Sequence, residues 1–314
     1  FFLFCRDEAC LVSTKQKKFR NLIMKIAVNG RLFKDNVTSE IQKIFDELFA
    51  RDAEIQISRA FKAFLDKKIT LKGQIDTYTG INDIFEADFV FSIGGDGTLL
   101  ETVTHIGRKE FPILGINSGR LGFLATTPSE IAISAIRSIF DGDYNFDERT
   151  LIRLVAEKDI FEGLNFGLNE FAILKSDTSA MIVVHTYLDG DYLNSYWADG
   201  LIVSTPTGST GYSLSCGGPI VFPHTSNFTI SPVSPHNLNV RPMVVSDSSV
   251  ISFEIEGRSK NFLVSLDSRS KTVDASIKMS VKKEDFKAKL VKLGNENFLN
   301  TLRNKLNWGL DIRN

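Results

Sequence analysis

One acidic residue lies in a glycine-rich turn between an expected strand and an expected helix. Without the acid, such a turn would be typical of a phosphate-binding site. Asp96 lies in the run GGDG at 94–97, between the apolar run 88–93, which predicts a buried strand, and residues 98–108, which predict a helix. Glycines let the backbone turn tightly and approach a ligand, and free N–H groups at a helix start suit an anion. A carboxylate there repels a phosphate, so it indicates a proton acceptor for an attacking hydroxyl or a ligand for a metal beside the phosphates. The alternative is a tight turn with a solvent-facing Asp96.

A second polar segment spans residues 199–219. It is rich in glycine and in hydroxyl side chains, and it lies between the end of an expected strand and the start of an expected helix. Its sequence is DGLIVSTPTGSTGYSLSCGGP, which offers many small donors and an approachable backbone, and Tyr212 can pack on a flat ring. A structureless loop of this length inside a compact domain is usually functional, so the segment predicts a ligand-binding surface.

Two shorter motifs are less specific. The amide and carboxylate of Asn169 and Glu170 could hydrogen-bond two vicinal hydroxyls of a ribose, although a surface pair at a strand end is the alternative. The run NSGRLGFL at 117–124 predicts a bend after a strand, and its Phe123 could face a ligand or belong to the core.

Several common sites are excluded by pattern. No P-loop, nucleophile elbow or protein-kinase motif occurs, and Leu100 stands where the third glycine of a dinucleotide-binding fingerprint should be. The histidines show no metal-ligand spacing, and those at 105 and 185 are expected to be structural; the four are His105, His185, His224 and His236.

Taken together, these motifs resemble the bacterial NAD kinase (ATP-NAD kinase) family. The resemblance is carried, in order, by IGGDGTLL, NSGRLGFL, Asn169-Glu170, the segment 199–219 and PHNLNVRP at 235–242, and it runs from about Met24 to the C-terminal LRNKLNWG. The GGDGT motif alone is shared with lipid kinases of the diacylglycerol and sphingosine type and, more loosely, with phosphofructokinases. The segment 199–219 separates this sequence from them.

The resemblance implies transfer of the ATP γ-phosphate to the 2′-hydroxyl of the adenosine ribose of NAD, which gives NADP. It implies a Rossmann-like α/β domain followed by an all-β domain, with the C-terminal helix packing back on the first. We therefore expect an α/β nucleotide-binding domain over 24–142, joined by 290–314, and an all-β NAD-binding domain over 143–289.

The resemblance also implies roles for individual residues. Asp96 is the expected proton acceptor, and Asn169 and Glu170 are expected to bind ribose hydroxyls. Divalent Mg²⁺ is expected with the substrates ATP and NAD, and no residue is assigned as a metal ligand. The other residues expected to line the binding site are Gly97, Leu100, Phe123, Asp199, Thr210, Gly211, Tyr212, Ser213, Leu214, Ser215, Ser234 and His236.

The sequence departs from the family pattern at three positions. Gly211 replaces the usual alanine before the tyrosine, Trp197 stands where some members carry a basic residue, and Glu101 stands where some carry an arginine. The phosphate-binding residues therefore remain open, and the candidates are Arg149, Arg241 and Arg269.

Composition narrows the class of protein. The 314 residues, 43% hydrophobic and 24% charged, indicate a globular chain of one large or two smaller domains. With 37 Lys plus Arg against 38 Asp plus Glu, no basic excess supports nucleic-acid binding. No apolar run approaches the ~18 residues that span a bilayer. The three cysteines cannot form a disulfide framework, so we expect a cytoplasmic protein, and the family resemblance suggests a homo-oligomer, a dimer or tetramer.

Periodicity predicts the elements that position these motifs. Residues 25–28, 88–93 and 111–116 predict buried strands, and helical apolar stripes lie between them, so the first half predicts a parallel sheet. Helix starts are expected at Ser39, as N-cap with Gln42 three residues on, and at Thr127, as N-cap before Pro128.

Beyond Asp143 the pattern changes to short alternating runs, which predict an antiparallel β domain up to about Lys282. Asp189-Gly190 is a two-residue hairpin signal between two of these runs. Apolar residues at helical spacing over 298–306 predict a final helix.

The stretch 1–23 carries its apolar residues before its charges, the reverse of a signal peptide. It is expected to be a disordered or over-called leader, with an appended helix as the alternative. Two other functions stay open at this stage: a lipid kinase acting at a membrane, and a nucleotide sensor that has lost activity.

Overall fold

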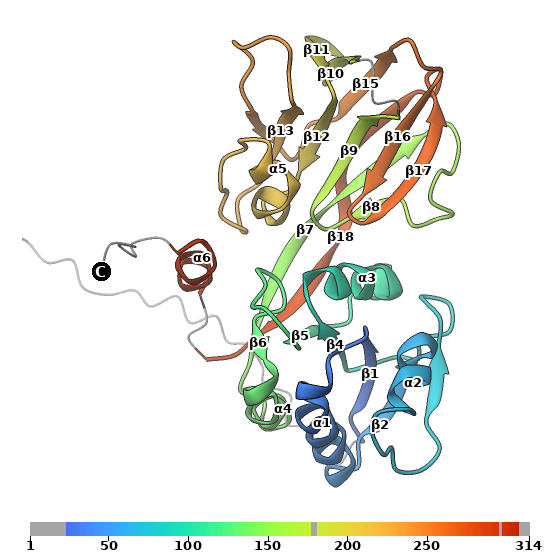
Figure 1. Cartoon of the computed structure of the whole chain (residues 1–314), viewed down its shortest axis with the longest axis vertical. Coiled ribbons are helices and arrows are strands. Elements are labelled where there is room, and N and C mark those ends of the chain that lie inside the picture. Colours follow the sequence, from blue (N-terminus) through green and yellow to red (C-terminus); the bar gives the residue numbers. More distant parts are fainter. Residues whose placement is uncertain (1–22, 177–180, 295–296, 308–314) are drawn as a thin grey trace, which may run out of the picture.

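The computed structural model describes residues 23–176, 181–294 and 297–307. All of the expected leader except its last residue lies outside the described residues. The chain forms an α/β domain and a β domain (Figure 1), so the predicted fold class is confirmed.

The first half of the chain builds a parallel sheet in the order β3-β2-β1-β4-β5, with every pairing parallel. The elements are β1 (Lys25–Gly30), η1 (Asp35–Val37), α1 (Thr38–Ala50), β2 (Glu54–Ser58), α2 (Arg59–Leu65), β3 (Asp76–Tyr78), β4 (Phe89–Gly94), α3 (Asp96–Ile106), η2 (Gly107–Lys109), β5 (Ile113–Asn117), β6 (Thr127–Pro128), η3 (Ser129–Ile131) and α4 (Ala132–Asp141). The strand order reverses between β1 and β4, and the carboxyl ends of strands at such a point form a crevice that commonly binds ligands.

Helices cover both faces of this sheet. Helices α1, α2 and α4 pack in one core with Ile26 and Val28, whereas α3 packs in a second core with Ala27. This division follows from strand geometry, since successive side chains of β1 point to opposite faces. Figure 1 shows α3 on the side of the sheet that faces the β domain.

Two predicted helix starts are wrong. A 3₁₀ turn leads into α1, which begins at Thr38, and the Ser39 hydroxyl donates to Glu40 instead of capping the helix; Gln42 instead bonds the backbone N–H and carbonyl of Thr70. Thr127 pairs with Ile116 in β6, so α4 starts only at Ala132. In both cases a 3₁₀ turn precedes the helix, and no side chain caps it.

The second half forms antiparallel strands in two sheets. They are β7 (Asn145–Ala156), β8 (Phe166–Gly167), β9 (Glu170–Lys175), β10 (Ile182–Leu188), β11 (Asp191–Ala198), β12 (Gly200–Ser204), β13 (Asn227–Val233), β14 (Met243–Ser246), β15 (Ile251–Glu256), β16 (Asn261–Leu266), β17 (Arg269–Asp274) and β18 (Met279–Lys292), with η4 (Thr207–Thr210) and α5 (Tyr212–Ser215) between β12 and β13. The hairpin at Asp189-Gly190 is confirmed, since both residues have positive φ angles and join β10 to β11.

Strand β18 makes the two domains one continuous structure. Its first part pairs with β15, and it pairs with β7 from Met279 to Lys292. Leu290 near its end also pairs in parallel with Ile113 of β5. The final helix α6 (Phe298–Leu306) then lies beside both domains: Phe298 contacts Phe222 of the β domain, and Lys305 donates to the carbonyl of Leu121. Helix α6 therefore does not pack on the first domain alone.

Candidate active site

The glycine junction ends β4 and starts α3 at Asp96. A Cβ atom at Gly94 would overlap the Thr98 hydroxyl, so this position has no room for a side chain. Gly95 and Gly97 have no atom within 4 Å of such a position and are exposed, which leaves the surface around the helix start open for a ligand. The first turn of α3 therefore presents N–H groups and a positive dipole end to this opening.

The Asp96 carboxylate is held by backbone N–H groups. Oδ2 accepts from Phe123 at 2.8 Å, and Oδ1 accepts from Leu124 and Ala125, both at 3.0 Å. The alternative of a solvent-facing turn is therefore wrong. A carboxylate has about four acceptor positions, so one remains on Oδ2 for a ligand.

The loop that supplies these N–H groups is shaped to receive the carboxylate. A Cβ atom at Gly122 would overlap Asp96 Oδ1, so only glycine permits this approach. Asn117 fixes the preceding bend, because its side chain accepts from Gly119 N at 2.7 Å and donates to the Arg120 carbonyl at 2.6 Å. The half-buried Phe123 thus contributes its backbone to the site directly.

Asn169 and Glu170 lie where β9 begins, and a half-buried aspartate fixes their backbone. Asp267 accepts from the N–H groups of Leu168 at 2.8 Å, Asn169 at 2.7 Å and Glu170 at 3.1 Å. Asp267 is separated by almost a hundred residues from its partners, so no local pattern of the sequence predicts its role.

The Glu170 side chain is buried without a full set of partners. Among the described residues, Glu170 Oε2 and Asn169 Oδ1 have no hydrogen-bond partner. Burial, and secondly the charge of Asp267, raise the pKa of Glu170 to about 8. Burial also raises the pKa of Asp267, against the effect of its three amide donors. The Glu170 carboxyl is therefore mostly neutral at pH 7, and it can both donate and accept a hydrogen bond.

The glycine- and hydroxyl-rich segment wraps around this pair. Thr205 N donates to the Asn169 carbonyl at 2.8 Å, and a Cβ atom at Gly208 would overlap the same carbonyl oxygen. The family usually has alanine at position 211, and a Cβ atom there would lie 3.2 Å from Glu170 Oε2. Gly211 therefore leaves space directly over the carboxyl group. Tyr212 follows with its side chain exposed.

The remaining expected site residues fall into three groups. Thr210, Leu214 and Ser215 are partly or fully exposed around Tyr212, whereas Ser213 is buried and bonds Ser231 at 2.9 Å. Asp199 forms a 2.7 Å ion pair with Lys175. Ser234 and His236 lie on an exposed loop, which His236 N ties to the Trp197 carbonyl at 2.8 Å.

A shared core brings the two halves of the site together. Leu100, four residues after Asp96, is buried in the same hydrophobic cluster as Leu168, which directly precedes Asn169. The side chain of Leu100 therefore belongs to the core beneath the site, while Gly97 remains at the surface.

The three candidate arginines differ in what they already bind. Arg149 is buried and forks onto Asp147 with two 2.8 Å bonds, while a third donor reaches Thr207. Arg269 donates to the carbonyls of Leu164 and Phe166, so it is no longer a candidate for phosphate binding. Arg241 is exposed and donates to carbonyls of its own loop.

Comparison with family models gives the class of protein. Residues 14–144 match the ATP-NAD kinase N-terminal domain, and residues 168–293 match the ATP-NAD kinase C-terminal domain. The chain is 56% identical over 292 residues to an NAD kinase of Cytophaga hutchinsonii, which covers 93% of this chain and 100% of the relative. An NAD kinase of Flavobacterium psychrophilum is 43% identical over 294 residues, with the same shares covered.

Solved structures agree with the fold. An NAD kinase from Archaeoglobus fulgidus in complex with ATP is 27% identical with a TM-score of 0.67, covering 90% of this chain and 99% of that chain. Yeast NADH kinase complexed with NADH superposes with a TM-score of 0.83 at 20% identity, covering 94% and 90%, and shows the shared fold. The chain belongs to the NAD kinase family, whose reaction is the phosphorylation of NAD.

Proposed function

We propose that this chain transfers the γ-phosphoryl group of ATP to the 2′-hydroxyl of the adenosine ribose of NAD, with Asp96 as the proton acceptor. One observation supports this role of Asp96. Its carboxylate lies at the start of α3, accepts hydrogen bonds from three backbone N–H groups of the loop 123–125, and keeps one acceptor position for a ligand. Asn169 and Glu170, joined to α3 through the shared core, are proposed to bind the ribose hydroxyls.

In the proposed reaction, the ribose 2′-oxygen forms a bond to the γ-phosphorus while the bond from that phosphorus to the bridging oxygen of ADP breaks. The hydroxyl proton passes to Oδ2 of Asp96, and ADP leaves with the bonding electron pair. A positioned base typically contributes ~10²–10⁴-fold, and in-line alignment with neutralised phosphate charge supplies the larger part.

Mg²⁺ is proposed to enter with ATP and to neutralise its phosphate oxygens. Among the described residues, no group of three or more His, Cys, Asp or Glu side chains is arranged to hold a metal. Mg²⁺ in nucleotide sites is usually held mainly by the phosphates and by waters, and we assign no residue of this chain as its ligand.

The domains and the outer binding residues are assigned in the same proposal. Residues 24–142 with 290–314 would handle the phosphate donor, and 143–289 would bind NAD. Exposed Tyr212 is proposed to stack on the adenine. The others proposed around the dinucleotide are Gly97, Leu100, Phe123, Asp199, Thr210, Gly211, Ser213, Leu214, Ser215, Ser234 and His236.

A cytoplasmic homo-oligomer that binds neither nucleic acid nor membrane is also proposed. The balanced charge supports the absence of a nucleic-acid partner. No helix of the described part of the chain is long and apolar enough to cross a bilayer. Gel filtration with light scattering tests the assembly, and a single-chain mass would contradict it.

The purified chain with NAD, ATP and Mg²⁺ tests the activity through NADP formation, detected with an NADP-specific dehydrogenase. Diacylglycerol in place of NAD serves as the lipid-kinase control. NADP formed only in the complete mixture is the expected result. Phosphorylation of the lipid, or dinucleotide binding without turnover, would contradict the proposal.

A further inference from the structure

Two buried charged side chains lie where the strands of the two domains meet. Asp147 and Arg149 are neighbours on one face of β7, and their side chains are 1% and 6% exposed. In the register of the strands, Asp147 is opposite Leu290 of β18, the residue that pairs in parallel with Ile113 of β5. Figure 1 shows β7 and β18 running from one domain to the other. The proposed reaction uses neither side chain.

The carboxylate of Asp147 is shared by three basic side chains from three elements. Arg149 donates to its two oxygens through Nε and Nη2, both at 2.8 Å, and Lys292 of β18 lies 2.7 Å from Oδ2. His224, from the loop that follows α5, has its Nε2 atom 3.5 Å from Oδ1. Burial opposes ionisation of Asp147, but the hydrogen bonds and charges of Arg149 and Lys292 outweigh it and lower the pKa of Asp147. The guanidinium of Arg149 is therefore held in one plane by a carboxylate that stays charged at pH 7.

The third contact of Arg149 reaches the glycine- and hydroxyl-rich segment. Its Nη1 atom donates to the Thr207 hydroxyl at 3.2 Å. Thr207 is the first residue of η4 and is itself buried. Three of the five N–H groups of Arg149 are thus occupied, two by the carboxylate and one by this hydroxyl. Arg149 therefore supports η4 from its buried side.

The position of Thr207 is passed on to Asn169 through short contacts. The next residue, Gly208, has no room for a side chain, because a Cβ atom there would lie 2.0 Å from the Asn169 carbonyl oxygen. Gly208 N also donates to the Thr205 hydroxyl at 3.1 Å, and that hydroxyl donates to the Leu168 carbonyl at 2.6 Å. The segment η4 and the start of β9 are therefore packed too closely to move independently.

The other end of η4 has an anchor of its own. The Ser209 hydroxyl accepts from Val221 N at 3.0 Å, in the loop that also carries His224. Gly211 and Tyr212, which are proposed to line the NAD site, follow directly after η4. The way in which the chain presents them depends on both anchors, of which the one at Thr207 is charged.

We propose that Arg149 is a positioning residue for NAD, which fixes η4 through Thr207 and thereby the residues that surround the dinucleotide. This role rests on the proposed function, because the NAD contacts of the segment are themselves proposed. Arg149, a candidate for phosphate binding from the sequence, is thus assigned to the acceptor dinucleotide and not to ATP.

The test compares Thr207→Val, which removes the hydroxyl and keeps the shape, with Thr207→Ser, which keeps the hydroxyl. Thr207→Val is expected to raise the dissociation constant of NAD, measured by calorimetry, about 3- to 10-fold, the equivalent of one hydrogen bond. The KM for NAD should rise with it, while the KM for ATP stays constant. Thr207→Ser should bind NAD as the wild type does.

A double-mutant cycle tests whether Arg149 acts through Thr207. Arg149→Lys keeps a positive charge beside Asp147, but an ammonium group cannot make the two-pronged contact and also reach Thr207. It is expected to weaken NAD binding by at least the same factor as Thr207→Val. The double variant should bind NAD no more weakly than Arg149→Lys alone. Additive losses would overturn the proposal, as would a rise in the KM for ATP instead of NAD, which would place Arg149 at the phosphates.

The matched control is Thr186→Val in β10, where a buried hydroxyl donates to the Val184 carbonyl at 3.4 Å, and it should leave the dissociation constant of NAD unchanged. The Thr207 pair decides alone if Arg149→Lys does not fold, since wild-type NAD affinity in Thr207→Val would overturn the proposal. Because calorimetry with NAD needs no turnover, failure of this positioning role is distinguishable from failure of the kinase reaction, which wild-type NADP formation tests alone.

Discussion

The two acidic residues of the candidate site, Asp96 and Glu170, sit in opposite environments. Three backbone N–H groups stabilise the carboxylate of Asp96 at the positive end of α3. Glu170 is buried beside another acid, Asp267, and one of its oxygens has no partner in the described part of the chain.

This difference assigns different chemistry to the same functional group. The environment of Asp96 fixes an anion in place, with one acceptor position aimed at an incoming proton. The environment of Glu170 favours the neutral acid, which can hold a sugar hydroxyl by donating and accepting. Two acids of one site can therefore serve different purposes because their surroundings differ.

The largest expected effect comes from Asp96→Asn, which removes the proton acceptor and keeps the shape. We expect kcat for NADP formation to fall about 10²–10⁴-fold. NAD affinity should change much less. The new side-chain NH₂ group would, however, face a backbone N–H group that donates to the carboxylate of Asp96 in the wild type. Asp141→Asn, at an exposed position ending α4, is the control. Wild-type turnover in Asp96→Asn would remove Asp96 from the chemistry.

The second effect tests whether the position of Asp96, and not only its charge, matters. In Gly122→Ala the added methyl would overlap Oδ1 and displace the carboxylate, so kcat should fall at least about tenfold. Gly119→Ala, in the same loop but with open space at its Cβ position, should leave kcat unchanged. Equal rates in the two variants would show that the loop does not position the base.

The third effect concerns stability and pH at Glu170. The pKa of Glu170 in the folded protein is about 8, above the ordinary value of 4.5. Its contribution to stability is therefore fully present below pH 4.5 and is lost as the pH rises through 8. The free energy of unfolding of the wild type should therefore fall by roughly 4 kcal/mol relative to that of Glu170→Gln between about pH 5 and about pH 9. Urea unfolding at both pH values measures this, and a constant difference would refute the assignment.

The smallest effect is on NAD affinity in the same variant. From the sequence alone, loss of a charge-assisted bond predicts a cost of about 1.5–3 kcal/mol in Glu170→Gln. Because the buried carboxyl is mostly neutral at pH 7, glutamine replaces it more closely, and we expect about 0.5–1.5 kcal/mol by calorimetry. The larger value would indicate that NAD binds the ionised form.

Local signals predicted much of this molecule. The alternation of strands and helices, the apolar stripe of the helix that follows the first strand, and the Asp189-Gly190 turn are all present as predicted. Each depends on neighbours in sequence. The continuation of β18 beyond Lys282 also had a local signal, since Phe286, Ala288 and Leu290 alternate with lysines and are buried.

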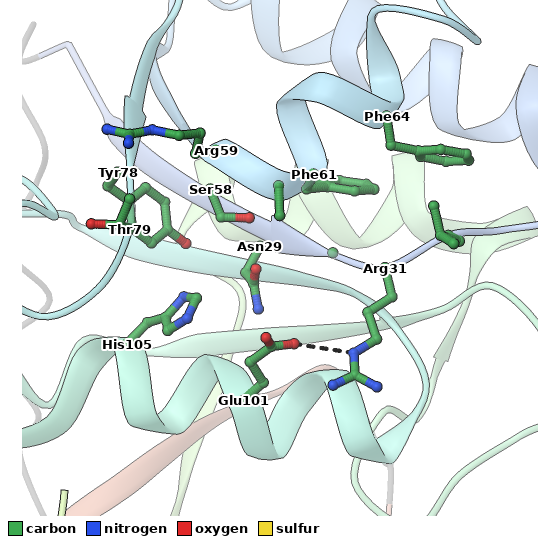
Figure 2. Close-up of a pocket in the computed structure, with 13 residues that line it drawn as sticks. Asn29, Arg31, Ser58, Arg59, Phe61, Phe64, Tyr78, Thr79, Glu101 and His105 are labelled. Carbon is green, nitrogen blue, oxygen red and sulfur yellow. Dashed lines mark hydrogen bonds and ion pairs between the residues drawn. The ribbon is translucent and has the colours of Figure 1, made fainter. Parts of the chain in front are cut away.

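Features that depend on distant contacts could not be predicted. Asp267 gains its role only because the β16–β17 turn meets the start of β9. A cavity lined by Ser58, Tyr78 and His105 (Figure 2) forms where the ends of β1, β2 and β3 meet α3. Even the amides around Asp96 come from a loop 27 to 29 residues away, whose glycines indicated a bend but not its partner.

The most direct measurement is a crystal structure with NAD bound. It should show the 2′-oxygen of the adenosine ribose about 2.6–3.2 Å from Oδ2 of Asp96, with the three loop amides still on the carboxylate. A 2′-oxygen held by any other residue, with Asp96 still turned wholly into its loop, would contradict the account.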